Sequence, residues 1–187
     1  MLRLTLHFLL ACGISMSSYA GETNLPAQFG LGQKANETEI KKWDSDITPD
    51  GKQLPPGKGN VTSGARIYQN KCLACHGESG RDGINDQLVA RFDPDINFSK
   101  DPTLKRTIGN YWPYATTLYD YINRAMPQAT PGSLSVNEVY SLVAYLLFLN
   151  DIVKEDVILD AGKLAAIKMP ARHLFYWSEE TRSAARP

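Results

Sequence analysis

The chain has 187 residues, and its 20 lysines and arginines balance 20 aspartates and glutamates, so the formal net charge is zero. This balance lacks the basic excess that usually marks a nucleic-acid-binding protein. A chain of this length is typical of one domain with extensions.

Residues 1–20 have the composition of a secretory signal peptide. A basic residue precedes an apolar stretch over residues 4–14, and small residues end at Ala20, where signal peptidase is expected to cleave. The apolar stretch is too short to span a bilayer, which takes about 20 residues. We therefore expect export to the periplasm. The alternative is lipidation at Cys12, because residues 9–12 resemble a lipobox, and the mass of the mature N-terminus distinguishes the two.

Residues 21–60 are rich in glycine, proline and charged residues. Two turn-forming runs, 49–51 and 54–59, leave little room for regular structure, although residues 38–43 have the pattern of one or two helical turns. We predict an extended arm that lies over a domain or a partner. A flexible linker is the alternative, but apolar residues recur too regularly for a chain that only solvates itself. These residues are Phe29, Ile40, Trp43, Ile47 and Leu54.

The first strong helix is predicted to begin at Thr62 or Ser63, since either side chain can cap its first amide groups. Gly64 offers a point at which another backbone can approach closely, and Tyr68 supplies an aromatic ring beside it. We expect Tyr145, from a later helix, to be the partner of this pair.

Residues 72–76 read Cys-Leu-Ala-Cys-His, which is the C-x-x-C-H pattern of covalent haem attachment. Cysteines three residues apart share one face of a helical turn, so Cys72 and Cys75 can both bond to one porphyrin. His76 is then the proximal ligand of the iron. A zinc site needs about four ligands, and no second cysteine pair exists. A thioredoxin-type dithiol would require a βαβ context, which the sequence lacks.

The identity of the sixth iron ligand separates an electron carrier from a gas binder or a peroxidase-like enzyme. A helix predicted from Ala115 to about Ala125 leads directly into Met126, which stands in an Arg-Ala-Met-Pro context. We predict Met126 as the distal ligand. Met169 and His173, which both follow the last core helix, and an open position are the alternatives.

Aromatic residues gather before and within the helix predicted at 115–125. They are expected either to wall the porphyrin or simply to pack in the core. Trp112 is the best candidate for a polar contact, because a buried indole usually finds an acceptor. The members are Tyr111, Trp112, Tyr114 and Tyr119.

The last strong helix begins at Ser135, which forms a capping box with Glu138, and is predicted to end at Asn150. Its apolar run over residues 142–149 is far shorter than a membrane span and fits a helix buried in a core. We therefore assign residues 61–150 to a haem domain and residues 151–187 to a C-terminal extension. The predicted class is all-α, with about three core helices, and no strand-period alternation is evident.

The haem motif, the later Met-Pro and the terminal apolar helix resemble a class I cytochrome c. Residues 111–150 are more specifically similar to the cytochrome subunits of bacterial sulfite dehydrogenases and of the sulfur dehydrogenase in the thiosulfate-oxidising Sox system. The flanks agree, through Phe29-Gly-Leu-Gly32, Trp43-Asp44, residues 49–57 and Lys168-Met-Pro-Ala-Arg172. The resemblance therefore covers about residues 29–172.

The resemblance implies a class I cytochrome c fold around one covalent haem c, with thioethers at Cys72 and Cys75 and iron ligands His76 and Met126. In class I cytochromes c the proximal histidine often donates to a proline carbonyl. This chain has no proline between the motif and Pro94, so the acceptor is left open. Some sulfur dehydrogenase cytochromes carry two haems, whereas this chain has one motif, which favours a single haem.

The resemblance further implies an electron-transfer protein rather than an enzyme. Its donor would be a molybdenum-cofactor subunit that oxidises sulfite or a sulfane-sulfur substrate, and its acceptor a soluble cytochrome or a terminal oxidase. A free electron shuttle for another periplasmic dehydrogenase or an oxidase is the alternative. A third hypothesis, an enzyme or gas sensor, requires an open iron, and tight carbon monoxide binding would support it.

Overall fold

The computed structural model describes residues 31–176. The expected signal peptide (1–20), the lipidation alternative at Cys12, the first ten residues of the arm and residues 177–187 lie outside these residues. The chain divides into two units, Met1–Ile40 and Lys41–Pro187. We describe each by itself.

Helix α1 (Glu37–Trp43) forms where the sequence predicts one or two helical turns. Asn36 and Glu39 form a reciprocal cap at the start of this helix. The Asn36 N–H donates to the Glu39 carboxylate at 2.9 Å, and the Glu39 N–H donates to the Asn36 side-chain oxygen at 3.0 Å. No residue of α1 is buried, and the Trp43 side chain is 78% exposed. This short helix therefore depends on local capping.

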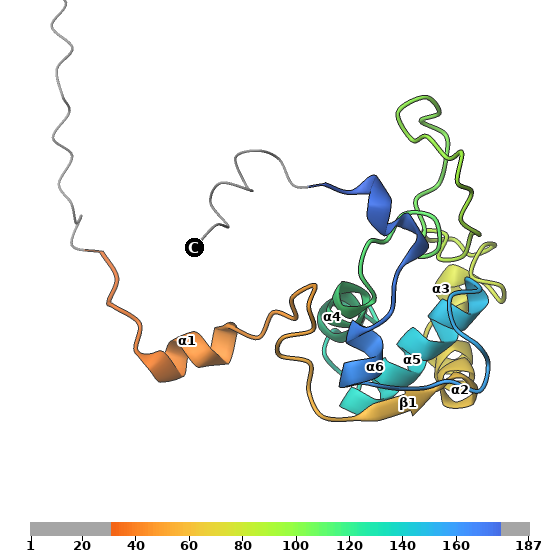
Figure 1. The fold of residues 1–187 in the computed structure, drawn as a ribbon. Coiled ribbons are helices and arrows are strands. Elements are labelled where there is room, and N and C mark those ends of the chain that lie inside the picture. Colours follow the sequence, from red (N-terminus) through yellow and green to blue (C-terminus); the bar gives the residue numbers. More distant parts are fainter. Residues whose placement is uncertain (1–30, 177–187) are drawn as a thin grey trace, which may run out of the picture. The chain divides into compact units, whose positions relative to one another are not determined.

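Helices predominate in the larger unit, as the sequence predicts (Figure 1). In chain order its elements are β1 (Lys58–Asn60), α2 (Val61–Lys71), α3 (Leu73–His76), α4 (Ala115–Ala125), α5 (Val136–Leu149), β2 (Ile158–Asp160), α6 (Ala161–Ala165) and the 3-10 helix η1 (Pro170–Leu174). Helix α5 packs against α2, α4 and β1 and forms the centre of the core. No helix among residues 31–176 is long and apolar enough to cross a membrane.

Helix α2 begins one or two residues earlier than predicted. Its N-cap is Asn60, whose side chain accepts a hydrogen bond from the Ser63 N–H at 2.8 Å. Thr62 and Ser63 therefore lie inside the helix, and the prediction that one of them caps it is wrong. The reason is that β1 ends at Asn60, so pairing with β2 sets where the extended backbone stops.

Helix α5 has the predicted boundaries. The capping box is present, with the Ser135 N–H donating to the Glu138 carboxylate at 2.8 Å, and Asn150 is the C-cap. Its face toward the core is fully buried. The residues with no exposed surface are Val139, Tyr140, Val143, Ala144 and Leu147.

Helices α2 and α5 approach closely at Gly64. A β-carbon there would lie 1.9 Å from the Ser141 carbonyl oxygen, so only glycine fits. The Tyr68 and Tyr145 rings pack beside this contact with centroids 5.3 Å apart. Both predictions, the close approach at Gly64 and the tyrosine pair, are confirmed.

The small sheet was not predicted. Strands β1 and β2 pair antiparallel with Gly59 opposite Leu159, which joins the end of the arm to the C-terminal extension. Ile47 from the arm is buried, and so is Met169 from the extension. Both flanks therefore contribute to the core.

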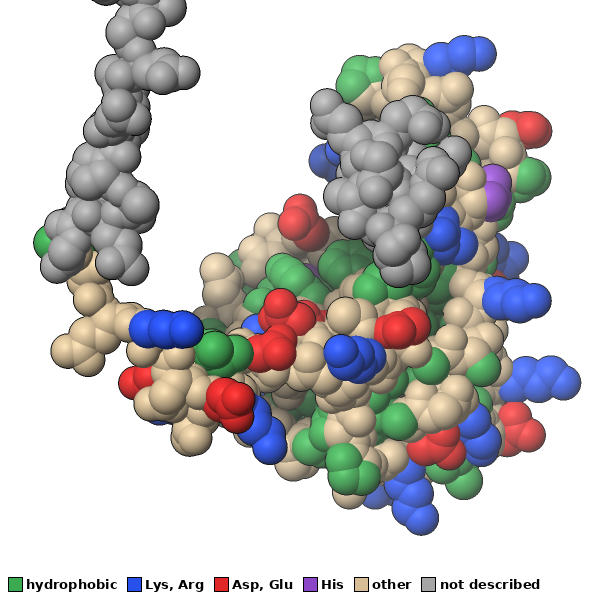
Figure 2. Space-filling model, turned by 60° about the vertical axis from the view of Figure 1, so that its left-hand side comes forward, with side chains coloured by type: hydrophobic (Ala, Val, Ile, Leu, Met, Phe, Trp, Pro, Cys, Tyr) green, Lys and Arg blue, Asp and Glu red, His purple; other side chains and the backbone are tan. Residues whose placement is uncertain are grey.

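Over the face shown in Figure 2, acidic and basic side chains are interspersed, as expected for a chain without net charge.

Candidate haem site

The C-x-x-C-H motif folds into a single helical turn. The Tyr68 carbonyl oxygen accepts from the Cys72 N–H at 2.8 Å, so α2 leads directly into α3. Within the turn, the Cys72 carbonyl oxygen accepts from Cys75 and His76 at 3.1 and 2.9 Å. The turn places two cysteines and a histidine on one short stretch, with Cys72 half-buried and Cys75 exposed.

Gly77 ends this turn with a φ of 76°, a backbone conformation that suits glycine. The Tyr68 hydroxyl donates to the Gly77 carbonyl oxygen at 2.8 Å and so connects the end of the turn to α2. The same tyrosine thus accepts at the start of the turn through its carbonyl and donates at its end through its side chain.

His76 is oriented by the backbone of the following loop. Its Nδ1 lies 2.9 Å from the Asp86 carbonyl oxygen. A carbonyl oxygen only accepts, so Nδ1 carries the proton and Nε2 keeps its lone pair. A metal-binding histidine is usually held in this way. The acceptor that the sequence left open is therefore a non-proline carbonyl, ten residues after the histidine.

The loop after the motif is folded back onto it. The Asn85 N–H donates to the Cys75 carbonyl oxygen at 2.9 Å. At Gly83 a β-carbon would lie 2.2 Å from the Cys75 carbonyl oxygen and 2.3 Å from the His76 carbonyl carbon, so the loop touches the motif's backbone. This contact brings Asp86 within reach of His76.

The Cys72 thiol does not have the character of a reactive thiolate or of a thiolate ligand. Burial raises the pKa of the Cys72 thiol to about 11, so this thiol stays protonated at neutral pH. Reactive and metal-binding cysteines instead have lowered pKa values. Among residues 31–176, no three Cys, His, Asp or Glu side chains gather into a metal-binding group.

Met126 is the C-cap residue of α4, and its N–H donates to the Ile122 carbonyl oxygen at 3.1 Å. The helix has the predicted boundaries. The Met126 side chain is partly buried and, like Cys72 and Leu73, packs against the hydrophobic core. It therefore reaches the same core as the motif from a different helix.

The two alternative distal ligands make the following contacts in the structure. Met169 is 4% exposed and belongs to the core. The His173 ring packs edge-on against Phe92 at 5.4 Å, and its Nδ1 lies 2.9 Å from the Pro170 carbonyl oxygen.

The aromatic residues near α4 make contacts within the protein. Tyr111 packs edge-on against Phe98 and Phe175, and the Arg172 guanidinium lies over the Tyr114 ring at 4.7 Å. Tyr119 is fully buried and packs against Tyr140 at a tilted angle of 53°, with ring centroids 4.6 Å apart, which is core packing. Trp112 is partly buried, packs edge-on against Tyr121 at 5.6 Å, and donates its indole N–H to the Thr117 hydroxyl at 3.0 Å. The predicted polar contact of Trp112 is thus made within the protein.

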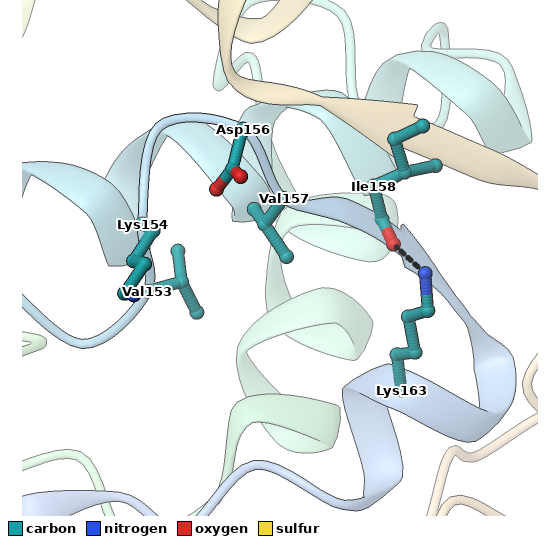
Figure 3. A pocket seen from close by; sticks show the side chains of 6 residues that line it. All are labelled: Val153, Lys154, Asp156, Val157, Ile158 and Lys163. Atoms are coloured by element: carbon teal, nitrogen blue, oxygen red, sulfur yellow. Dashed lines mark hydrogen bonds between the residues drawn. The ribbon is translucent and has the colours of Figure 1, made fainter.

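The donor set of these residues fits a haem. The motif offers two cysteine side chains and one imidazole whose Nδ1 is already hydrogen-bonded, and the C-cap of α4 offers a thioether, which together would attach a haem c and ligate its iron. A separate shallow pocket contains none of these residues (Figure 3). It is lined by Val153, Lys154, Asp156, Val157, Ile158 and Lys163, whose ammonium group donates to the Ile158 carbonyl oxygen at 3.0 Å.

Residues 59–146 match the protein family described as cytochrome C oxidase, cbb3-type, subunit III. The chain is also similar to a chain in the crystal structure of the sulfane dehydrogenase SoxCD from Paracoccus pantotrophus, with 33% identity, a TM-score of 0.69, and coverage of 84% of this chain and 76% of that one. A comparison with curated proteins found no match. The chain belongs to the class I c-type cytochromes.

Membership in this family confirms the predicted fold class and an electron-transfer role. A cytochrome c domain implies haem c as its cofactor. Sequence reasoning located the motif but missed the Asp86 carbonyl. No side chain marks a backbone acceptor, so only the loop's path could identify it.

Proposed function

We propose that this protein is a periplasmic cytochrome with one covalent haem, which accepts single electrons from a molybdenum-containing sulfite or sulfur dehydrogenase. It passes them to a soluble cytochrome or a terminal oxidase. The similarity to a chain of the sulfane dehydrogenase SoxCD, at 33% identity over 84% of this chain, carries the assignment of the donor. The single C-x-x-C-H motif supports one haem.

Each site residue has a defined part in this proposal. Haem supplies a one-electron couple. Cys72 and Cys75 would attach the haem, His76 would bind its iron through Nε2 while the Asp86 carbonyl fixes the imidazole ring, and Met126 would supply the second protein ligand. Iron held by two protein ligands would transfer electrons without binding a substrate.

The mode of attachment is tested by acidified-acetone extraction of the purified protein. We expect the pigment to remain with the polypeptide, because two thioether bonds hold it. Extraction of the pigment into acetone would contradict covalent attachment.

The distal ligand is tested with Met126→Ala. We expect the variant to lose the far-red absorption band of methionine-ligated ferric haem. Met169→Leu is the matched control, because Met169 lies in the core and its replacement should leave the band intact. Retention of the band in Met126→Ala would refute the assignment.

The donor is tested by rapid mixing. The oxidised cytochrome is mixed with sulfite and the molybdenum dehydrogenase from the same bacterium, and haem reduction is followed by absorbance. We expect fast reduction that requires both sulfite and dehydrogenase. Absence of reduction with sulfite and with sulfane-sulfur substrates would eliminate this donor class.

The free-shuttle alternative draws support from one observation. The C-terminal part of the arm packs against the haem domain, because Ile47 is buried and β1 pairs with β2. A truncation must therefore stop before Asp46, whose carboxylate pairs with Arg124. Removing residues 21–45 leaves donor kinetics unchanged for a free shuttle and slows them if the arm binds a partner.

A further inference from the structure

Asn150, the C-cap residue of α5, makes more hydrogen bonds than helix termination requires. Its side chain is buried, with the residue only 4% exposed. The amide group donates to the Leu146 carbonyl oxygen at 2.8 Å, which lies within its own helix. It also donates to the Leu88 carbonyl oxygen at 3.3 Å and accepts from the Ala90 N–H at 3.1 Å. One side chain therefore holds a segment sixty residues away in the sequence.

The segment held by Asn150 directly follows the carbonyl group that orients His76. Only Gln87 separates Asp86 from Leu88. Two residues of extended chain span at most about 7 Å, so fixing Leu88 limits how far the Asp86 carbonyl can move. On the other side, Asn85 is fixed by its 2.9 Å hydrogen bond to the Cys75 carbonyl oxygen. Leu88 is also held by its N–H, which donates to the Gly80 carbonyl oxygen at 2.8 Å, and by its carbonyl oxygen, which accepts from the Ile108 N–H at 3.1 Å. The Asp86 carbonyl is thus held between two attachment points, Asn85 and the segment at Leu88, to which Asn150 contributes.

The two attachment points differ in origin. The contact of Asn85 with Cys75 belongs to the motif's own loop. The contacts of Leu88 and Ala90 with Asn150 connect this loop to the central helix of the core. A backbone carbonyl has no side chain to fix it, so its position depends on such contacts.

We propose that Asn150 is a positioning residue for the proximal ligand, acting through Leu88 and Ala90 to hold the Asp86 carbonyl against His76 Nδ1. The proposal rests on the proposed ligation of iron by His76. A hydrogen bond from Nδ1–H makes the imidazole a stronger electron donor, which favours the ferric form. Loss of Asn150 is therefore expected to favour the ferrous form.

Gly109 allows the same arrangement to be perturbed from the other side. A β-carbon at Gly109 would lie 2.4 Å from Asn150 Oδ1 and 2.1 Å from the Ala90 carbonyl oxygen. Gly109→Ala must therefore displace the Asn150 side chain or the 88–90 segment, although residue 150 is still asparagine. It provides a second variant that does not depend on the first one folding.

The test compares Asn150→Leu and Gly109→Ala with the unmodified holoprotein. Leucine has a similar shape but makes no hydrogen bonds. Thr116→Val is the matched control, because Thr116 is also buried and its hydroxyl bridges to a distant segment through the Pro49 carbonyl oxygen at 3.0 Å. The readouts are the reduction potential, the solvent exchange of the histidine Nδ1–H by NMR in the ferrous state, and thermal stability.

We expect both test variants to raise the ratio of ferrous to ferric protein at a fixed ambient potential by about threefold to tenfold. A tenfold change corresponds to about 59 mV for a one-electron couple. Exchange of the Nδ1–H should accelerate in both. Thr116→Val should lose stability with its potential and its exchange unchanged.

Lowered stability with unchanged potential and unchanged Nδ1–H exchange in the test variants would overturn the proposal, because Asn150 would then only stabilise the fold. If His76 does not ligate the iron at all, the absorption spectrum of the unmodified protein shows this before any variant is compared. In that case the unmodified protein would lack the absorption spectrum of low-spin, histidine-ligated haem.

Discussion

Replacing Gly64 with alanine tests the contact on which the motif's position depends. The new β-carbon would lie 1.9 Å from the Ser141 carbonyl oxygen and 2.7 Å from the Tyr145 β-carbon. Both distances are far below the ordinary contact distance of about 3.5 Å. Because the first clash is with backbone, α2 must move away from α5 by about 1 Å or more. Helix α2 leads directly into Cys72, so the motif would move with it.

Two opposing terms set the magnitude. Alanine is favoured over glycine inside a helix by about 1 kcal/mol. Overpacking a core contact costs about 1–3 kcal/mol and sometimes more, and a clash with backbone belongs at the upper end. We therefore expect Gly64→Ala to destabilise the protein by about 2 kcal/mol. For a chain of this length, that lowers the midpoint of thermal unfolding by roughly 4–8 °C.

The assay is thermal unfolding of the holoprotein, followed by far-UV circular dichroism. Gly162→Ala in α6 is the matched control, because its β-carbon would lie 3.6 Å from the Asp160 carboxylate, which is ordinary contact. We expect this control to gain up to about 1 kcal/mol. If Gly64→Ala is as stable as the unmodified protein, the close approach of α2 and α5 is wrong.

Three further predictions concern local features. Asn60→Ala should cost about 1 kcal/mol of stability through loss of the α2 cap, whereas Thr62→Ala should be nearly neutral. Both are measured by urea unfolding. A larger loss of stability in Thr62→Ala than in Asn60→Ala would show that Thr62 is the cap, as the sequence predicts. Hydrogen bonds from Ser135 hold the pKa of Glu138 below its ordinary value of 4.5. The stability that the charged Glu138 carboxylate contributes is therefore fully present above pH 4.5 and is lost as the pH falls through the lowered pKa. The difference in unfolding free energy between the unmodified protein and Glu138→Gln should then shrink in acid. A difference that does not change with pH would contradict this. Tyr119→Phe should raise the free energy of unfolding by about 1 kcal/mol, because the buried hydroxyl has no hydrogen-bond partner among the described residues. A loss of stability would instead show that the hydroxyl has a hydrogen-bond partner.

Features encoded by residues close in sequence were predictable. The haem motif occupies five consecutive residues, and the capping box joins Ser135 to Glu138 within one helical turn. The boundaries of α4 follow from its local apolar pattern, and those of α5 follow from its apolar pattern and its capping box. The contact at Gly64 joins two helices, yet it was predictable because a glycine inside a strong helix suggests that another backbone comes close.

Features that join distant parts of the chain were not predictable in this way. The Asn60 cap was missed because three-residue strands have too short a pattern to detect, and their pairing sets where α2 begins. The burial of Met169 depends on how the extension returns to the core after β2 and α6.

The sequence by itself determined the chemistry that we propose for this protein, because thioether attachment and imidazole ligation would need particular side chains at a fixed short spacing. Only the tertiary structure decided how the imidazole is held. The acceptor is a backbone carbonyl at Asp86, and Asn150, far along the chain, fixes the segment beside it. Every residue carries such a carbonyl group, so its identity emerges only when the chain path brings one of them to His76.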